Sequence, residues 1–137
     1  SNNKSEFYSV DLKTGVTNWI NDINSNLTPI IIGNLIFTVS NEGYLHVIEK
    51  SNGNIIRIND LYVNYKQKKR NKLKPIGFVI GNDKLFLTNT DGNMIVVDLS
   101  DGKITGMKKV AGDFTSKPFI YNKNLFVIKN GSILKFN

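Results

Sequence analysis

The sequence of 137 residues contains no cysteine, which excludes disulfide bonds and thiolate metal ligands. It contains one histidine, His46, and a lone histidine without a cysteine or a second histidine nearby is typical of an ordinary strand residue. No apolar run approaches the roughly 18 residues of a transmembrane helix, and residues 1–4 lack the apolar core of a signal peptide. If the natural protein is exported, its signal must lie outside this chain.

The net charge of +7 comes largely from one segment. Six of the eighteen basic residues fall between Lys66 and Lys74, and the remainder of the chain is nearly neutral. A dedicated nucleic-acid protein would carry basic residues along a whole face. We therefore do not expect a nucleic-acid partner.

Helical periodicity is also missing, and short apolar runs separated by glycine and asparagine take its place. This pattern predicts an all-β fold of short antiparallel strands. Several runs, such as Ile30 to Ile32 and Leu85 to Leu87, are apolar without alternation, which predicts strands buried on both faces.

An internal repeat organises these strands. Residues 9–15, 47–53 and 96–102 share one order: two small or apolar residues, an acid, two variable positions, a polar residue and glycine. The acids and glycines are Asp11 and Gly15, Glu49 and Gly53, and Asp98 and Gly102. Glycine supplies a positive φ at the end of a turn and the acid accepts backbone N–H groups across it, so each segment predicts a hairpin turn.

A second signal fixes the period. Each proline of the chain, Pro29, Pro75 and Pro118, opens an apolar strand that is followed by a short turn and another apolar strand. Gly15 and Gly53 are 38 residues apart, and the middle copy is about ten residues longer. The extra residues coincide with the basic run, so residues 63–74 are predicted to be an inserted loop.

The first copy, with Asp11, Thr14, Gly15 and Trp19, resembles the tryptophan-docking repeat of the quinoprotein-like β-propellers. This family includes pyrroloquinoline-quinone (PQQ) dehydrogenases and the BamB lipoproteins of outer-membrane β-barrel assembly, and the repeat is most like the latter. The tryptophan position is Arg57 in the second copy and Gly106 in the third. Aliphatic packing is therefore expected to hold those blades together.

The resemblance predicts about three antiparallel four-stranded blades of a six- to eight-bladed ring. Residues 1–27 would form half a blade, 28–62 the first full blade, 75–112 the second, and 113–137 three strands of the last. With Ser1 in mid-blade and Asn137 as a natural C-terminus, the chain would be the C-terminal portion of a larger protein. Its open strand edges would permit self-association.

Catalytic, cofactor and metal sites are not expected, because the repeat acids Asp11, Glu49 and Asp98 fall one to a blade and cannot act as a pair. The basic run is either a solvated loop or a partner-binding surface for an acidic partner, anionic lipid or nucleic acid. The candidate partner-binding residues are Tyr62, Tyr65, Lys66, Lys68, Lys69, Arg70, Lys72 and Lys74.

The resemblance implies a non-enzymatic scaffold for protein–protein interaction, with a BamB-like role in the periplasm at the outer membrane. Its partner would be the β-barrel assembly complex, and no cofactor would be needed. One alternative is the C-terminal fragment of a PQQ-dependent dehydrogenase, although a calcium–quinone cage cannot be mapped onto these residues. A second alternative is docking to nucleic acid or an anionic surface through the basic loop. An anionic lipid surface would place the protein close to a membrane.

Overall fold

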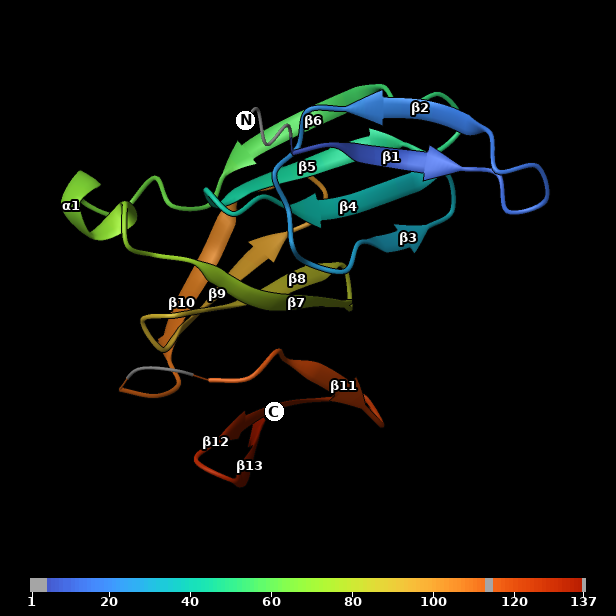
Figure 1. Cartoon of the computed structure of the whole chain (residues 1–137). Coiled ribbons are helices and arrows are strands. Elements are labelled where there is room, and N and C mark those ends of the chain that lie inside the picture. The colour runs from blue at the N-terminus through green and yellow to red at the C-terminus, as the bar shows by residue number, and fades with distance from the viewer. Residues whose placement is uncertain (1–4, 113–114, 137) are drawn as a thin grey trace.

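The computed structural model describes residues 5–112 and 115–136, which form four antiparallel β-sheets (Figure 1). Sheet 1 contains β1 (Phe7–Val10) and β2 (Thr17–Asn21), and sheet 2 contains β3 (Ile30–Ile32), β4 (Leu35–Val39), β5 (Tyr44–Glu49) and β6 (Ile55–Asp60). Sheet 3 contains β7 (Pro75–Gly81), β8 (Lys84–Asn89), β9 (Asn93–Asp98) and β10 (Ile104–Lys109), and sheet 4 contains β11 (Phe119–Tyr121), β12 (Asn124–Lys129) and β13 (Ser132–Phe136). Strands that are consecutive in sequence are neighbours in each sheet, which confirms the all-β antiparallel fold class.

The sheets follow one another in space, from the N-terminal strands at the top of Figure 1 to the C-terminal strands at the bottom. One helical turn, α1 (Gln67–Arg70), lies in the connection between β6 and β7. No helix in the described part of the chain is long and apolar enough to cross a membrane. The expectations for Ser1 and Asn137 concern positions outside the described residues.

The largest hydrophobic cluster lies between sheets 2 and 3. It joins Phe37 and Val39 of β4 to Phe78 of β7 and Leu87 of β8, and all four side chains are buried. Four consecutive residues of β4, from Ile36 to Val39, are buried. Leu85 and Leu87 of β8 are buried as expected, but the expectation for Ile30 to Ile32 was wrong, because β3 is an edge strand and leaves Ile31 and Ile32 about half exposed. A smaller cluster that includes Met94 and Val127 joins sheet 3 to sheet 4.

The three repeat segments form the same turn. In each, the N–H of the glycine donates to the carbonyl of the acidic residue four positions earlier, at 2.8 Å. Gly15, Gly53 and Gly102 have φ values of 72°, 77° and 73°, which confirms the expected positive φ. The Asp11 and Asp98 carboxylates accept backbone N–H groups within their turns, and these bonds contribute to a lowered pKa at both residues. Glu49, whose side chain is longer, accepts the side-chain amide of Asn52 instead.

Trp19 joins sheet 1 to sheet 2. Its indole Nε1 donates to the carbonyl oxygen of Lys50 at 3.0 Å, and its ring covers Gly53. A Cβ on Gly53 would lie 2.6 Å from that ring, so no larger residue fits there. Two residues further along β2, the amide of Asn21 donates to the carbonyl oxygen of Gly53 at 2.9 Å. We call the last strand of each sheet its outer strand. The outer strand of sheet 1, β2, therefore docks on a turn of sheet 2.

Arg57 makes the corresponding contact between sheets 2 and 3. Its guanidinium donates to the carbonyl oxygens of Leu99 at 2.6 Å and Ser100 at 2.8 Å. Leu99 follows its repeat acid as Lys50 follows Glu49, so the accepting position is the same. Asn59, two residues after Arg57, covers Gly102 as Trp19 covers Gly53. The expectation of aliphatic packing was thus incomplete, because a polar docking contact accompanies the apolar core.

Sheet 3 has no docking side chain at the third equivalent position, Gly106. A Cβ there would meet only Val96, at 3.9 Å. Val96 lines a cavity of about 850 Å³ between sheets 3 and 4, together with Phe86, Leu125 and Phe136. Sheet 4 is therefore held mainly by the small cluster around Met94 and Val127.

Candidate functional site

The basic run of the sequence lies on the connection that contains α1, which projects from the body of the sheets in Figure 1. We call residues 63–74 the insertion. The sequence predicts a loop here, and the structure shows one helical turn with non-helical turns on both sides. Three basic side chains, Lys68, Lys69 and Arg70, fall in that turn.

Arg70 fixes the C-terminal part of the insertion to sheet 2. Its two terminal nitrogens donate to the two carboxylate oxygens of Asp60, at 2.7 and 2.8 Å. The guanidinium also lies over the ring of Tyr44, 5.3 Å from its centroid. The hydrogen bonds to Asp60 raise the pKa of Arg70. A bidentate pair of this kind is stronger and more directional than an ordinary surface contact.

A second group of contacts fixes the insertion to sheet 3 through Asp91. The ammonium of Lys69 lies 3.1 Å from this carboxylate, and the Tyr65 hydroxyl donates to it at 3.2 Å. Burial by itself would raise the pKa of Asp91, but hydrogen bonds from Asn93 and Lys69 outweigh burial and lower it. Burial raises the pKa of Tyr65 to about 12, so its hydroxyl stays protonated and able to donate.

Tyr62 does not belong to a partner-binding surface in this structure. Its side chain is fully buried, its ring packs on Gly43, and its hydroxyl donates to the side-chain oxygen of Asn89 at 2.7 Å. Burial raises the pKa of Tyr62. Its assignment to the partner-binding set is corrected accordingly: a ring with no exposed surface cannot contact a partner unless the core opens. Leu73 is buried in the same cluster.

The remaining candidates are exposed lysines. Lys66, Lys68, Lys72 and Lys74 are all accessible, and the part of the chain that the structure describes provides no ion pair for them. Lys74 contributes to lowering the pKa of Glu42, so its charge is partly compensated. The eight candidates therefore divide into residues that contact the blades and lysines that are exposed to solvent. The sequence could not make this division, because Asp60 and Asp91 lie outside the insertion.

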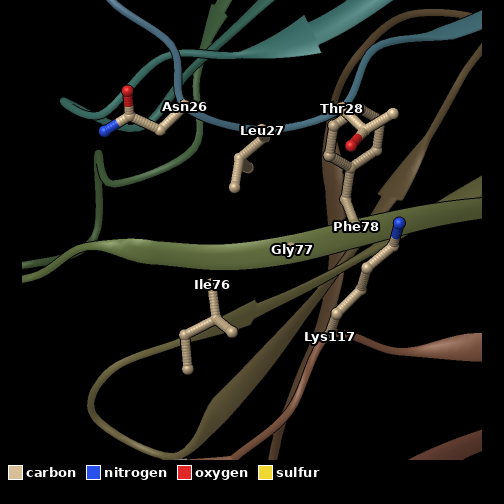
Figure 2. A pocket seen from close by; sticks show the side chains of 7 residues that line it. All are labelled: Asn26, Leu27, Thr28, Ile76, Gly77, Phe78 and Lys117. Atoms are coloured by element: carbon tan, nitrogen blue, oxygen red, sulfur yellow. The ribbon is translucent and has the colours of Figure 1, made fainter.

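A separate cavity of about 100 Å³ lies beside β7 (Figure 2). Its lining residues are Asn26, Leu27, Thr28, Ile76, Gly77, Phe78 and Lys117. Gly77 is required for the close approach of Lys117, since a Cβ would lie 2.7 Å from that side chain. The cavity has room for about three water molecules and is well below the roughly 300 Å³ of small-molecule sites. It contains none of the candidate residues.

His46 is an ordinary strand residue in the structure. It lies in β5, is 9% exposed, and its Nδ1 lies 3.1 Å from the carbonyl oxygen of Tyr44. Burial lowers its pKa, which favours the neutral ring. Over residues 5–112 and 115–136, no cluster of three or more histidine, aspartate or glutamate side chains is arranged to hold a metal ion.

Antiparallel sheets of up to four strands follow one another, and the last strands of sheets 1 and 2 each dock on a turn of the following sheet; this arrangement defines a run of β-propeller blades. Residues 1–59 match the family model described as outer membrane protein assembly factor BamB. The N-terminal part of the chain is therefore similar in sequence to that family.

Solved structures bear out this assignment of the fold over nearly the whole chain. BamB from Moraxella catarrhalis matches 96% of this chain with a TM-score of 0.71 and 15% identity, and Sqt1 from Saccharomyces cerevisiae matches 98% with a TM-score of 0.79 and 16% identity. The computationally designed Ika4 protein matches 97%, with a TM-score of 0.73 and 11% identity.

The chain spans 37% of that BamB chain, 40% of Sqt1 and 79% of Ika4, and at these identities the likeness shows the fold alone. Among curated proteins, none matches the sequence significantly.

Proposed function

We propose that the chain is part of a non-enzymatic β-propeller scaffold for protein–protein interaction, with a BamB-like role in outer-membrane protein assembly. The observation that carries this proposal is the match of residues 1–59 to the BamB family model. The anchored insertion supports it, because its lysines are exposed on a support that is tied to two blades. The proposed location is the periplasm, at the outer membrane.

The proposed mechanism is recognition rather than reaction. Arg70 and Lys69 hold the insertion in place through carboxylates of sheets 2 and 3, so the exposed side chains need little ordering when a partner binds. Preorganisation of this kind increases affinity by lowering the entropy cost of binding.

Photo-crosslinking of the full-length protein in its host would test the scaffold role. A photoreactive residue at position 64, an exposed asparagine of the insertion, is expected to crosslink to components of the barrel-assembly complex. A probe at exposed Lys13, on the turn between β1 and β2 at the other end of the blades, serves as the matched control. Crosslinked products from which mass spectrometry recovers no barrel-assembly component would refute the assembly role.

The dehydrogenase alternative rests on the same type of repeat and needs its own test. The full-length protein would be incubated with PQQ and calcium and assayed for substrate-dependent dye reduction. Dye reduction would favour the enzyme over the scaffold, and its absence with a loaded positive-control enzyme would leave the scaffold proposal in place.

A further inference from the structure

The insertion has two faces of different composition. The inner face consists of side chains that contact the blades: Tyr65, Lys69, Arg70 and Leu73. The outer face consists of Lys66, Lys68 and Lys72, whose side chains are exposed and make no ion pair within the described ranges. We call these three residues the lysine ridge.

The surroundings of the lysine ridge supply little compensating charge. No acidic residue occurs between Leu61 and Asn82 in the sequence. The two carboxylates that reach the insertion from the blades, Asp60 and Asp91, are already bound by Arg70 and Lys69. A third carboxylate, Glu42, interacts with Lys74, which flanks the ridge and contributes to lowering the pKa of Glu42. The ridge therefore presents positive charge that an external anion can neutralise.

The chemistry of the exposed groups narrows the class of partner. The arginine of the insertion, which could bind a phosphate with two parallel hydrogen bonds, is occupied by Asp60. Tyr62 is buried, and the Tyr65 ring packs against Tyr62 and lies beneath the Lys69 ammonium, 5.0 Å from the ring centroid, so the insertion presents no free aromatic platform for stacked bases. Val63 is the one exposed large apolar side chain of the insertion, too little for insertion into lipid.

We propose that the lysine ridge is a docking site for an acidic polypeptide segment, whose carboxylates pair with Lys66, Lys68 and Lys72. This proposal rests on the scaffold function and names the chemistry of its partner. The anchors fix the position of the insertion, while the lysine ends remain mobile enough to match carboxylates that are not rigidly spaced.

Fluorescence anisotropy with a labelled twelve-residue peptide of alternating glutamate and serine tests the proposal. The variant K66Q/K68Q/K72Q removes the three charges of the ridge and keeps polar side chains of similar helix propensity. Its affinity for the peptide at low salt is expected to fall about tenfold, since three exposed ion pairs are lost. Binding to the unchanged protein is expected to weaken as salt is raised.

The matched control is K13Q/K50Q/K123Q, which removes the same charge from exposed turns at the other end of the strands. The control is expected to bind the peptide within twofold of the unchanged protein. Circular dichroism and thermal melting of both variants establish that they are folded.

Equal weakening in the two variants would mean attraction by net charge alone and would overturn the proposal, as would undetectable binding of the peptide. Tighter binding of phosphatidylglycerol vesicles or a single-stranded oligonucleotide, with the same dependence on the ridge, would replace the acidic polypeptide by that class of partner. Failure of this test leaves the photo-crosslinking result, and hence the scaffold proposal, to be judged separately.

Discussion

Arg57 and Trp19 show how two chemically different side chains can serve one position of a repeat. Each reaches forward from an outer strand to the carbonyl that follows the repeat acid of the next sheet. The indole contributes ring surface and one donor, whereas the guanidinium contributes two donors and a charge. The position is therefore defined by reach and donor geometry rather than by aromatic character.

Arg57→Ala is expected to destabilise the protein by about 2 kcal/mol, because hydrogen bonds from a charged donor to two carbonyls are lost. Arg57→Lys is expected to recover less than half of this loss, since an ammonium cannot reproduce the planar fork. Urea unfolding provides the measurement, and Ile56→Ala, on the exposed neighbouring residue, is the control. Equal stability of Arg57→Ala and the parent would contradict the docking role.

His46 predicts a pH dependence of stability. Its folded-state pKa lies below the ordinary value of 6.5, so the unfolded chain takes up a proton first as pH falls. The contribution of His46 to the free energy of unfolding is therefore fully present above about pH 7. It is lost as pH falls through 6, with a slope of at most about 1.4 kcal/mol per pH unit. Thermal melting between pH 7.5 and 5.5 should show this decline in the parent and a smaller one in His46→Gln. Parallel pH profiles of the parent and His46→Gln would rule out this role of His46.

The turn glycines and the docking tryptophan were predictable from sequence, because a positive φ and a large ring leave recognisable residue types. The role of Arg57 was not predictable. Arginine at an outer strand is ordinarily a solvated residue, and only the folded distance to Leu99 and Ser100 identifies its contact.

At the scale of elements, the insertion combines local and remote contacts. Its place in the chain follows from the change of repeat period. Its helical turn and its attachment to the blades could not be predicted, because Asp91 lies more than twenty residues beyond Lys69 and becomes a neighbour only after sheet 3 forms. The same attachment explains why Tyr62 belongs to the core and not to the surface.

Arg70→Ala is expected to loosen the insertion without unfolding the blades. The pair with Asp60 is bidentate but partly exposed, so a loss of about 1 kcal/mol in global stability is expected. The larger effect should be faster hydrogen exchange of backbone amides in residues 64–72. Lys68→Ala, in the same helical turn, is the control and should leave exchange unchanged. Unaltered protection in Arg70→Ala would show that Asp60 does not anchor the insertion.

At the scale of the whole molecule, the sheets are joined unequally. Sheets 1, 2 and 3 are linked by docking side chains, whereas Gly106 provides none toward sheet 4 and a cavity of about 850 Å³ lies beside that interface. The all-β fold was predictable from the repeat. The unequal joining of the sheets was not predictable, because it depends on which side chains meet between them.

Native-state hydrogen exchange of the 137-residue chain is expected to show sheet 4 opening first. In low denaturant, amides of β12 should lose protection before those of β4, β5 and β8, since fewer buried contacts hold sheet 4. Simultaneous loss of protection in all four sheets would indicate a single cooperative unit instead.

Open strand edges predict self-association of the isolated chain. Among the strands of the described residues, β13 pairs with β12 alone, and its Ile133 is 65% exposed. An apolar edge of this kind can pair with another copy, and a lysine on the edge opposes such pairing. Light scattering should therefore show larger species for the parent than for Ile133→Lys at equal concentration. Identical masses across concentrations for both proteins would exclude pairing through β13.

The forward reach of Trp19 and Arg57 also determines where such a protein could be cut and recombined. A division at the boundary between sheets, near Tyr62, would place Arg57 in one piece and its acceptors Leu99 and Ser100 in the other. A piece running from β6 through the turn at Gly102 keeps donor and acceptor together. The transferable module of this chain is thus one outer strand followed by the three inner strands of the next sheet.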